Sequence, residues 1–191
     1  MIRWLLAILA ALSPAGAHAP AERGRVQLPT PPAPIPTEDY TALDTWTDGR
    51  CTVTRIGPSI VTAAHCLNGA TGWTVEGDRA WQGPPVDWVD PSRIPRGATL
   101  YGIGYPAKTG RTPVAYALAA LDPRTVTVGR DQVLVLMALG EGVPCSQGAS
   151  GFVGWVTIDG QPQPVGTLSV YSTDPDVTSL PAGQYVCGFT I

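Results

Sequence analysis

Short apolar runs, separated by turn signals, recur along most of the chain. They are rich in β-branched residues, which favour strands over helices. Thr125–Val128 and Val133–Leu136 are strongly strand-like, and Gly129-Arg130-Asp131 predicts a turn between them. The alanine-rich stretch Tyr116 to Leu121 is compatible with helix or strand. The runs span residues 51–56, 59–63, 72–76, 86–89, 98–104, 113–121, 125–128, 132–139, 152–158, 165–171 and 184–190. Strands at this spacing predict an all-β sandwich or barrel.

The composition agrees with a folded protein that contains many turns. Hydrophobic residues make up 44% of the 191 residues, which is enough for a buried core. The 22 glycines and 20 prolines favour turns and short strands over long helices. One large domain or two small halves that share an interface fit this length. The net charge of −3 is too small to indicate a nucleic-acid or anionic membrane partner.

The N-terminus has the pattern of an export signal over residues 1–21. Arg3 gives a positive start, Trp4 to Leu12 an apolar core, and Ala15-Gly16-Ala17 or Ala17-His18-Ala19 a cleavage site. The apolar core is too short to span a bilayer, which needs about 20 residues. A retained N-terminal anchor is the alternative. We therefore expect a secreted protein with no membrane association after the leader is removed.

A proline-rich segment follows over residues 22–39 and is expected to be a linker or a short pro-segment. Such a composition favours extended, solvated backbone and cannot bury enough surface to fold. The folded domain is expected over residues 40–191. The prolines of the segment include Pro29, Pro31, Pro32, Pro34 and Pro36.

Four cysteines in an exported chain predict two disulfides, for which three pairings exist. Cys51 and Cys66 flank the predicted strand at 59–63, and Cys145 and Cys187 both lie in the C-terminal part. We favour the local pairing, Cys51 with Cys66 and Cys145 with Cys187. A zinc site is the alternative for cysteines beside a histidine, but the chain has no C-x-x-C pair.

The stretch Ile60-Val61-Thr62-Ala63-Ala64-His65-Cys66 places a histidine where a predicted core strand ends. The other histidine, His18, lies in the expected leader. Histidine has an unperturbed pKa near neutrality and is suited to proton transfer. The stretch resembles the T-A-A-H-C motif of the chymotrypsin-like serine proteases. The resemblance covers residues from about 48 to 191 and implies two packed six-stranded antiparallel β-barrels with His65 as general base.

A second stretch, Pro144-Cys145-Ser146-Gln147-Gly148-Ala149-Ser150-Gly151, resembles the serine motif G-D-S-G-G of the same family. By this resemblance Ser150 is the nucleophile, and the N–H groups of Gly148 and Ser150 form the oxyanion hole. An α/β-hydrolase has G-x-S-x-G and a histidine after its nucleophile. Here Phe152 stands at the last position and His65 precedes Ser150, which is the order of the chymotrypsin-like proteases.

The orienting carboxylate is the least defined member of the site. The family carries D-[I/L]-A-x-L between the histidine and the serine, and no stretch here matches that pattern well. Asp87, flanked by Val86 and Trp88, is our first choice, and Asp90 and Asp78 remain open. Ala149 stands where most of the family has aspartate before the nucleophile, so activation by insertion of a freed N-terminus is not expected.

Leu168-Ser169-Val170-Tyr171 resembles the strand that lines the primary specificity pocket, which is S-W-G in many members of the family. Ser169, Val170 and Tyr171 are therefore expected to line that pocket, with Tyr171 narrowing it. No acidic residue lies just upstream of Cys145, which argues against a preference for Arg or Lys. A small or medium apolar residue is expected on the acyl side of the scissile bond.

The resemblance implies a secreted, monomeric serine endopeptidase that acts on protein or peptide substrates without a metal or organic cofactor. His65, Asp87 and Ser150 would form its catalytic triad. An inactive homologue that binds a protein partner in the same cleft is the alternative function. An esterase on the same scaffold is a third.

Overall fold

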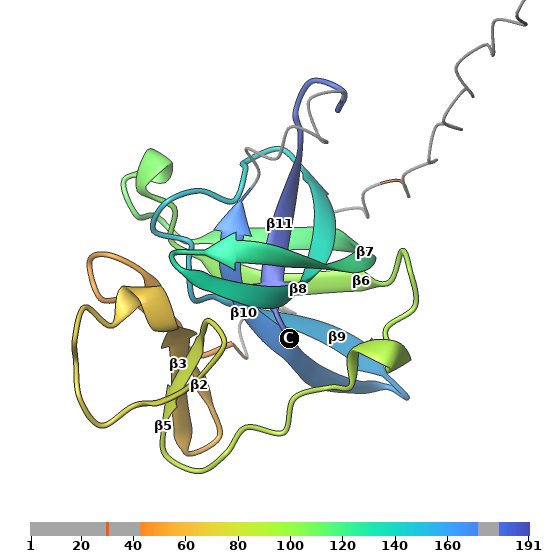
Figure 1. Cartoon of the computed structure of the whole chain (residues 1–191). Coiled ribbons are helices and arrows are strands. Elements are labelled where there is room, and N and C mark those ends of the chain that lie inside the picture. The colour runs from red at the N-terminus through yellow and green to blue at the C-terminus, as the bar shows by residue number, and fades with distance from the viewer. Residues whose placement is uncertain (1–29, 31–42, 172–179) are drawn as a thin grey trace, which may run out of the picture.

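The computed structural model describes residue 30 and residues 43–171 and 180–191, which form two packed β-structures (Figure 1). Three short 3₁₀ helices, η1 (Ala64–Cys66), η2 (Pro91–Arg93) and η3 (Ala107–Thr109), lie in the connections. The N-terminal strands are β1 (Thr45–Thr47), β2 (Thr52–Ile56), β3 (Ser59–Ala63), β4 (Thr74–Glu76) and β5 (Arg79–Gln82). The C-terminal strands are β6 (Thr99–Gly104), β7 (Val114–Val128), β8 (Asp131–Glu141), β9 (Val153–Ile158), β10 (Gln161–Tyr171) and β11 (Gln184–Thr190).

The N-terminal half is an antiparallel five-stranded sheet with the order β1-β2-β3-β5-β4. Its centre is β3, which pairs with β2 on one side and with β5 on the other. The last pair of the second ladder is Ala63 with Arg79. The start of β5 therefore lies beside the end of β3, and the turn before β5 reaches the residues that follow β3.

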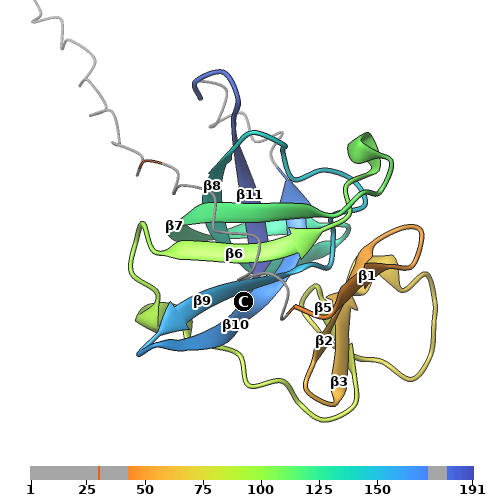
Figure 2. The same cartoon turned by 180° about the vertical axis from the view of Figure 1, so that it is seen from behind.

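The C-terminal half is a closed six-stranded barrel with the order β10-β11-β8-β7-β6-β9. Figure 2 shows β6 and β7 crossing above β9 and β10 on the side turned away in Figure 1. Val128 pairs with Asp131, so Gly129 and Arg130 form the turn between β7 and β8, as the sequence predicts. Closure leaves no unpaired edge within the barrel.

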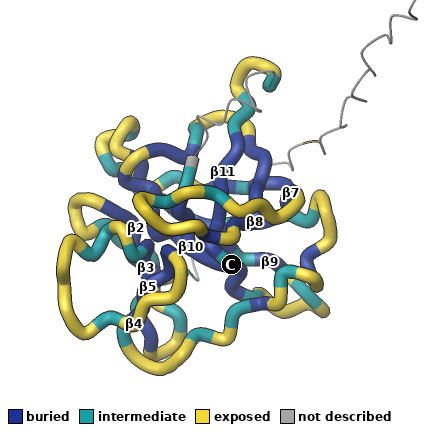
Figure 3. The backbone as a smooth tube through the Cα atoms, in the orientation of Figure 1, coloured by how far each residue is buried: buried dark blue, intermediate teal, exposed yellow. Residues whose placement is uncertain are grey.

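Three aromatic rings pack together in the core of the barrel. The ring centroid of Phe152 lies 5.0 Å from that of Tyr116, in a stacked arrangement, and 5.2 Å from that of Phe189, in an edge-to-face arrangement. All three side chains are buried, and every barrel strand contributes buried residues (Figure 3). Phe152 follows the serine loop directly, so the core fixes one end of that loop.

The two halves meet through a smaller apolar cluster. Val61 and Trp81 come from the N-terminal sheet and Val153 from β9, and all three are buried. Val86, Trp88 and Trp155 pack against this cluster from its margins. Val61 lies two residues before the end of β3 and Val153 is the first residue of β9, so the cluster is next in sequence to the segments that carry His65 and Ser150.

The predicted arrangement of two packed antiparallel β-structures is confirmed, with one difference in strand number. The N-terminal sheet has five strands and is open, where six in a barrel were expected. Residues 86–89 form no strand, and the alanine-rich residues 116–121 belong to β7. The described residues include no helix with the length and hydrophobicity to cross a bilayer. The expected signal peptide at 1–21 lies outside the described residues, as does nearly all of the proline-rich segment at 22–39.

Candidate active site

His65 lies in η1, directly after β3. Val61 and Ala63 of β3 are fully buried and hold the end of the strand in the sheet. The chain then turns through Ala64 and His65, and the histidine side chain remains 39% exposed. A fixed backbone with a partly exposed imidazole suits a group that must exchange protons with a substrate.

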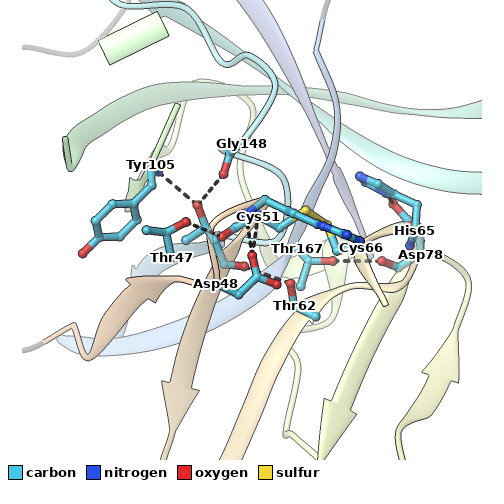
Figure 4. The surroundings of a disulfide bond; sticks show 12 residues. Thr47, Asp48, Cys51, Thr62, His65, Cys66, Asp78, Tyr105, Gly148 and Thr167 are labelled. Carbon is cyan, nitrogen blue, oxygen red and sulfur yellow. Dashed lines mark hydrogen bonds and ion pairs between the residues drawn. A yellow bond between two sulfur atoms is a disulfide. The ribbon is translucent and has the colours of Figure 1, made fainter. Parts of the chain in front are cut away.

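Asp78 is the carboxylate that meets His65. Its Oδ2 lies 2.7 Å from Nδ1 of the imidazole, and its Oδ1 accepts a hydrogen bond of 2.9 Å from the backbone N–H of His65. The backbone C=O of Asp78 also accepts a bond from the N–H of Ala64. The Asp78 side chain is only 4% exposed. Both carboxylate oxygens thus hold the histidine, one through its ring and one through its backbone (Figure 4).

The turn between β4 and β5 explains this position. Gly77 and Asp78 form a two-residue turn, and Gly77 has a φ of 56°, which glycine adopts without strain. Since β5 pairs with β3, the turn lies beside η1. The next residue is Arg79, whose Nη2 lies 2.8 Å from Oε2 of Glu76. Its guanidinium carbon lies over the Trp88 ring, 5.0 Å from the ring centroid. Burial lowers the pKa of Arg79, although Glu76 opposes this effect.

Asp87, the first choice from the sequence, is not the partner of His65. It is exposed, and its apolar neighbours Val86 and Trp88 pack at the interface between the halves and form no strand. Asp90 is exposed as well, and its Oδ1 accepts a hydrogen bond of 2.9 Å from the N–H of Ser92 at the start of η2. This hydrogen bond lowers the pKa of Asp90. Asp78, the third carboxylate that the sequence left open, is therefore the partner of His65 in place of Asp87.

Ser150 lies in the loop between β8 and β9 and is 5% exposed. The loop is tied to both halves by backbone bonds: Thr52 N–H donates to the Ser150 C=O at 2.8 Å, and Gly151 N–H to the Leu168 C=O at 2.9 Å. Gly151 has a φ of 89°, and a Cβ there would lie 2.4 Å from the carbonyl oxygen of Thr52. Only glycine fits, because the loop crosses β2 at close range.

The N–H groups of Gly148 and Ser150 donate no hydrogen bond to another described residue. The preceding carbonyl, that of Gln147, accepts a bond of 2.7 Å from the N–H of Ala107. Gly148 has a φ of 93°, and its own carbonyl accepts a bond of 3.0 Å from the Thr52 hydroxyl. The carbonyls of Gln147 and Gly148 are therefore engaged elsewhere, while the N–H groups of Gly148 and Ser150, on either side of Ala149, have no acceptor among the described residues, as an oxyanion hole requires.

Both disulfides predicted from the sequence are formed, Cys51–Cys66 and Cys145–Cys187. The first joins the residue before β2 to the residue after His65. The second joins the serine loop to β11. Ligand atoms of Cys51, His65 and Cys66 lie within 4.8 Å of one another, the kind of grouping that could hold zinc. The two sulfurs are bonded to each other, so neither is a thiolate ligand in this form.

Thr52 is a residue that the sequence did not identify. It is fully buried at the start of β2, and its hydroxyl donates to the Gly148 C=O and accepts from the N–H of Tyr105, both at 3.0 Å. Its own C=O accepts a bond of 2.9 Å from the Thr62 hydroxyl. Figure 4 shows these bonds converging beside the Cys51–Cys66 disulfide. Ala149, where the family has aspartate, is fully buried in the barrel core, so Thr52 supplies a polar tie for the loop that alanine cannot.

We expect Thr52→Val to lower kcat/KM for peptide hydrolysis by about tenfold, because the buried Gly148 carbonyl and the half-buried Tyr105 N–H lose their partner and the Gly148 peptide is released. Thr52→Ser, which keeps the hydroxyl, should retain most of the activity. Thr54→Val is the matched control, since Thr54 is also buried on β2 but its hydroxyl has no hydrogen-bond partner within the described part of the chain. Equal losses in the Thr52→Val and Thr54→Val variants would contradict this role.

A cleft of about 360 Å³ lies between the two halves and brings these groups together. His65 and Ser150 both line it, together with Gly148 of the expected oxyanion hole. The remaining wall residues are Arg50, Cys51, Cys66, Asn68, Arg111 and Gln147. An imidazole oriented by a carboxylate, a serine and two free N–H groups thus surround one space that a peptide could enter.

Comparisons with known proteins agree with this geometry at the level of fold. No protein-family model and no curated protein matches the sequence. Among solved structures, the NS6 protease of murine norovirus, as an inactive mutant, superposes with a TM-score of 0.58 at 12% identity, over 78% of this chain and 92% of that one. The chain has the chymotrypsin-like protease fold. The chymotrypsin-like protease Rv3671c of M. tuberculosis, in an inactive mutant form, gives a TM-score of 0.53 at 15% identity over 85% of this chain and 91% of that one.

The strand expected to line the primary specificity pocket is part of β10 in this chymotrypsin-like fold. Ser169 is buried, and its hydroxyl contacts the Thr190 hydroxyl and the Thr167 C=O. Where β10 pairs with β11, the register shifts between Leu168 and Val170. Neither Ser169 nor Val170 lines the cleft that contains His65 and Ser150. The side chain of Tyr171 lies outside what the structure describes, so its effect on the pocket stays a prediction.

Proposed function

We propose that this protein is an exported serine endopeptidase that cleaves peptide bonds with Ser150, His65 and Asp78. The observation that carries the proposal is the 2.7 Å contact between His65 Nδ1 and Asp78 Oδ2, in a cleft that Ser150 also lines. Histidine, acid and serine follow one another along the chain in the order of the chymotrypsin-like proteases. The solved structures of the same fold are themselves named as proteases, which supports a hydrolase.

In this mechanism Asp78 accepts the Nδ1–H of His65, which leaves Nε2 unprotonated and able to act as the base for Ser150 across the cleft. His65 Nε2 takes the proton of the Ser150 hydroxyl as its oxygen attacks the substrate carbonyl. The resulting tetrahedral oxyanion accepts hydrogen bonds from the N–H groups of Gly148 and Ser150. His65 then donates the proton to the leaving amine, and an acyl group remains on Ser150. Water, deprotonated by His65, attacks this ester and restores the serine.

The surroundings of the pair fit these steps. Asp78 is nearly excluded from water, so its charge acts on the imidazolium at short range with little solvent screening. His65 is partly exposed and can exchange protons with substrate and water. The donors of the oxyanion hole are backbone groups fixed by Thr52 and Ala107, and such preorganised donors need no rearrangement during the reaction.

A fluorophosphonate probe tests the proposal directly, because it modifies only serines that a base has activated. The leader-free, disulfide-bonded protein should be labelled at Ser150, as located by peptide mass spectrometry. Ser150→Ala should abolish the labelling and serves as the control for background reaction. If the wild-type protein stays unlabelled while folded, the alternative of an inactive homologue that binds a protein partner is favoured.

A second measurement separates endopeptidase from esterase. Peptide amides and the corresponding esters should both be hydrolysed by the wild-type protein that has not been treated with the probe, with measurable turnover of the amide. Hydrolysis of esters alone would contradict the peptidase assignment and leave the triad intact. A peptide library would at the same time test the expected small or medium apolar residue on the acyl side.

A further inference from the structure

The cleft beside Ser150 carries two arginines and no carboxylate among its wall residues. Arg50 and Arg111 enter it from opposite halves of the molecule, Arg50 just before β2 and Arg111 just after η3. The five ion pairs of the described residues involve neither arginine. The nearest acid in sequence, Asp48, uses its Oδ1 to accept the backbone N–H groups of Arg50 and Cys51. A chain of net charge −3 thus has a locally positive cleft.

Arg111 is held in place by an unusual backbone. It has a φ of 63°, a left-handed conformation that costs energy for any residue other than glycine, and it follows Gly110 with a φ of 64°. Its N–H donates to the Pro106 C=O at 3.3 Å. Nη1 lies 2.9 Å from the point where a Cβ of Gly148 would stand, so the guanidinium rests against the oxyanion loop.

The guanidinium of Arg111 is incompletely paired. Nη1 is shielded from solvent and has no hydrogen-bond partner among the described residues. A guanidinium presents several N–H donors in a planar fork that matches a carboxylate. Nη1 packs against the Gly148 loop, and Arg111 as a whole is only half-buried, so its other N–H donors are the ones that a ligand in the cleft can reach.

The position of the cleft indicates which part of a peptide it receives. The acyl half of the substrate stays on Ser150, while the leaving half receives its proton from His65. The cleft extends from Ser150 past His65 to Cys66 and Asn68. Residues of β10, expected to hold the acyl half, do not line it. The leaving half of the peptide therefore fits this space.

We propose that the cleft selects peptides with a glutamate or aspartate in the first two positions of the leaving half, whose carboxylate pairs with Arg111 and Arg50. The inference rests on the proposed peptidase function for its place in the reaction. The two guanidinium groups supply the charge and the donors, and the shielding of Nη1 strengthens the attraction over that in open solvent.

The test compares matched peptides that differ only by Glu against Gln, or Asp against Asn, at these two positions. We expect kcat/KM to be about tenfold higher for the acidic member, the scale of one charge-assisted hydrogen bond, and the ratio to fall with added salt. Arg111→Gln should lower this ratio, and the double variant with Arg50→Gln should bring it close to one. Arg130→Gln, at the exposed turn between β7 and β8, removes the same charge away from the cleft and is the control.

Binding to the Ser150→Ala protein, measured by fluorescence anisotropy with the same peptides, separates this inference from the peptidase proposal. Tighter binding of the acidic member supports the inference even if the wild-type protein is not labelled by fluorophosphonate. Equal binding and equal kcat/KM for the acidic and the amide peptide would overturn the inference. Labelling of Ser150 in the same protein would still support the peptidase proposal. Equal losses for both peptides in Arg111→Gln would also overturn it, since the arginine would then serve the oxyanion loop and not an acidic residue.

Discussion

Replacing Asp78 by asparagine is expected to lower kcat for peptide hydrolysis by about 10⁴-fold, with a much smaller change in KM. The amide has no charge to stabilise the imidazolium, and it can donate to Nδ1, which favours the tautomer with the proton on the wrong nitrogen. Asparagine keeps an oxygen that can accept the backbone N–H of His65, the bond that Asp78 Oδ1 makes at 2.9 Å. The fold should therefore survive, as circular dichroism and thermal unfolding would show.

Asp87→Asn is the matched control for this prediction. It removes the same charge from an exposed residue that contacts neither His65 nor the cleft, so kcat should stay near the wild-type value. A large loss in the Asp87 variant with retained activity in the Asp78 variant would restore the expectation from the sequence and contradict the geometry described above.

Replacing Phe152 by alanine is expected to reduce the free energy of unfolding by about 3–5 kcal/mol. The ring is fully buried between Tyr116 and Phe189, so its removal leaves a cavity in the barrel core. Since small domains are stable by only about 5–15 kcal/mol, this is a large part of the total. Denaturant unfolding followed by intrinsic fluorescence, with the disulfides intact, measures the effect.

Leu134→Ala is the control for the Phe152 variant. Leu134 lies on β8 of the same barrel but is 48% exposed, so its truncation should cost much less. Phe152 also ends the serine loop, where its N–H donates to the Ala149 C=O at 3.2 Å. The Phe152 variant should thus lose fluorophosphonate labelling at denaturant concentrations that leave the Leu134 variant reactive. Similar midpoints for the two variants would show that the ring stack is not the main support of the barrel.

The strands, the disulfide pairing, and the neighbourhood of His65 and Ser150 could be anticipated because their signals are local. β-branched runs, glycine turns and the two short motifs each occupy a few consecutive residues. The alanine-rich part of β7 could not be assigned in this way, since its neighbours β6 and β8 decide its conformation. The number of strands in the first half also depends on tertiary pairing, so its five strands could not be predicted from local signals.

Asp87 was preferred to Asp78 for a related reason. Asp87 attracted attention because Val86 and Trp88 are apolar, but those side chains pack at the seam between the halves and do not mark a strand. Asp78 has polar or charged neighbours, and its role depends on the pairing of β5 with β3. The available signal was the Gly77-Asp78 pair, a two-residue hairpin turn after a predicted strand. The role of Thr52 had no local signal at all, since its partners, Gly148 and Tyr105, are distant in sequence.

The Gly77-Asp78 turn also divides the chemistry unevenly between the halves. His65 and Asp78 are 13 positions apart and belong to one sheet, so base and acid move together as a preassembled unit. Ser150 belongs to the barrel, and its position relative to the imidazole is set by the Val61–Trp81–Val153 seam together with the hydrogen bonds from Thr52 to the serine loop. Any stress that slides this seam, such as pressure or mild denaturant, would uncouple attack from proton transfer while each half retained its own strands. The catalytic rate would then fall when the two halves shift apart, well before either half unfolds.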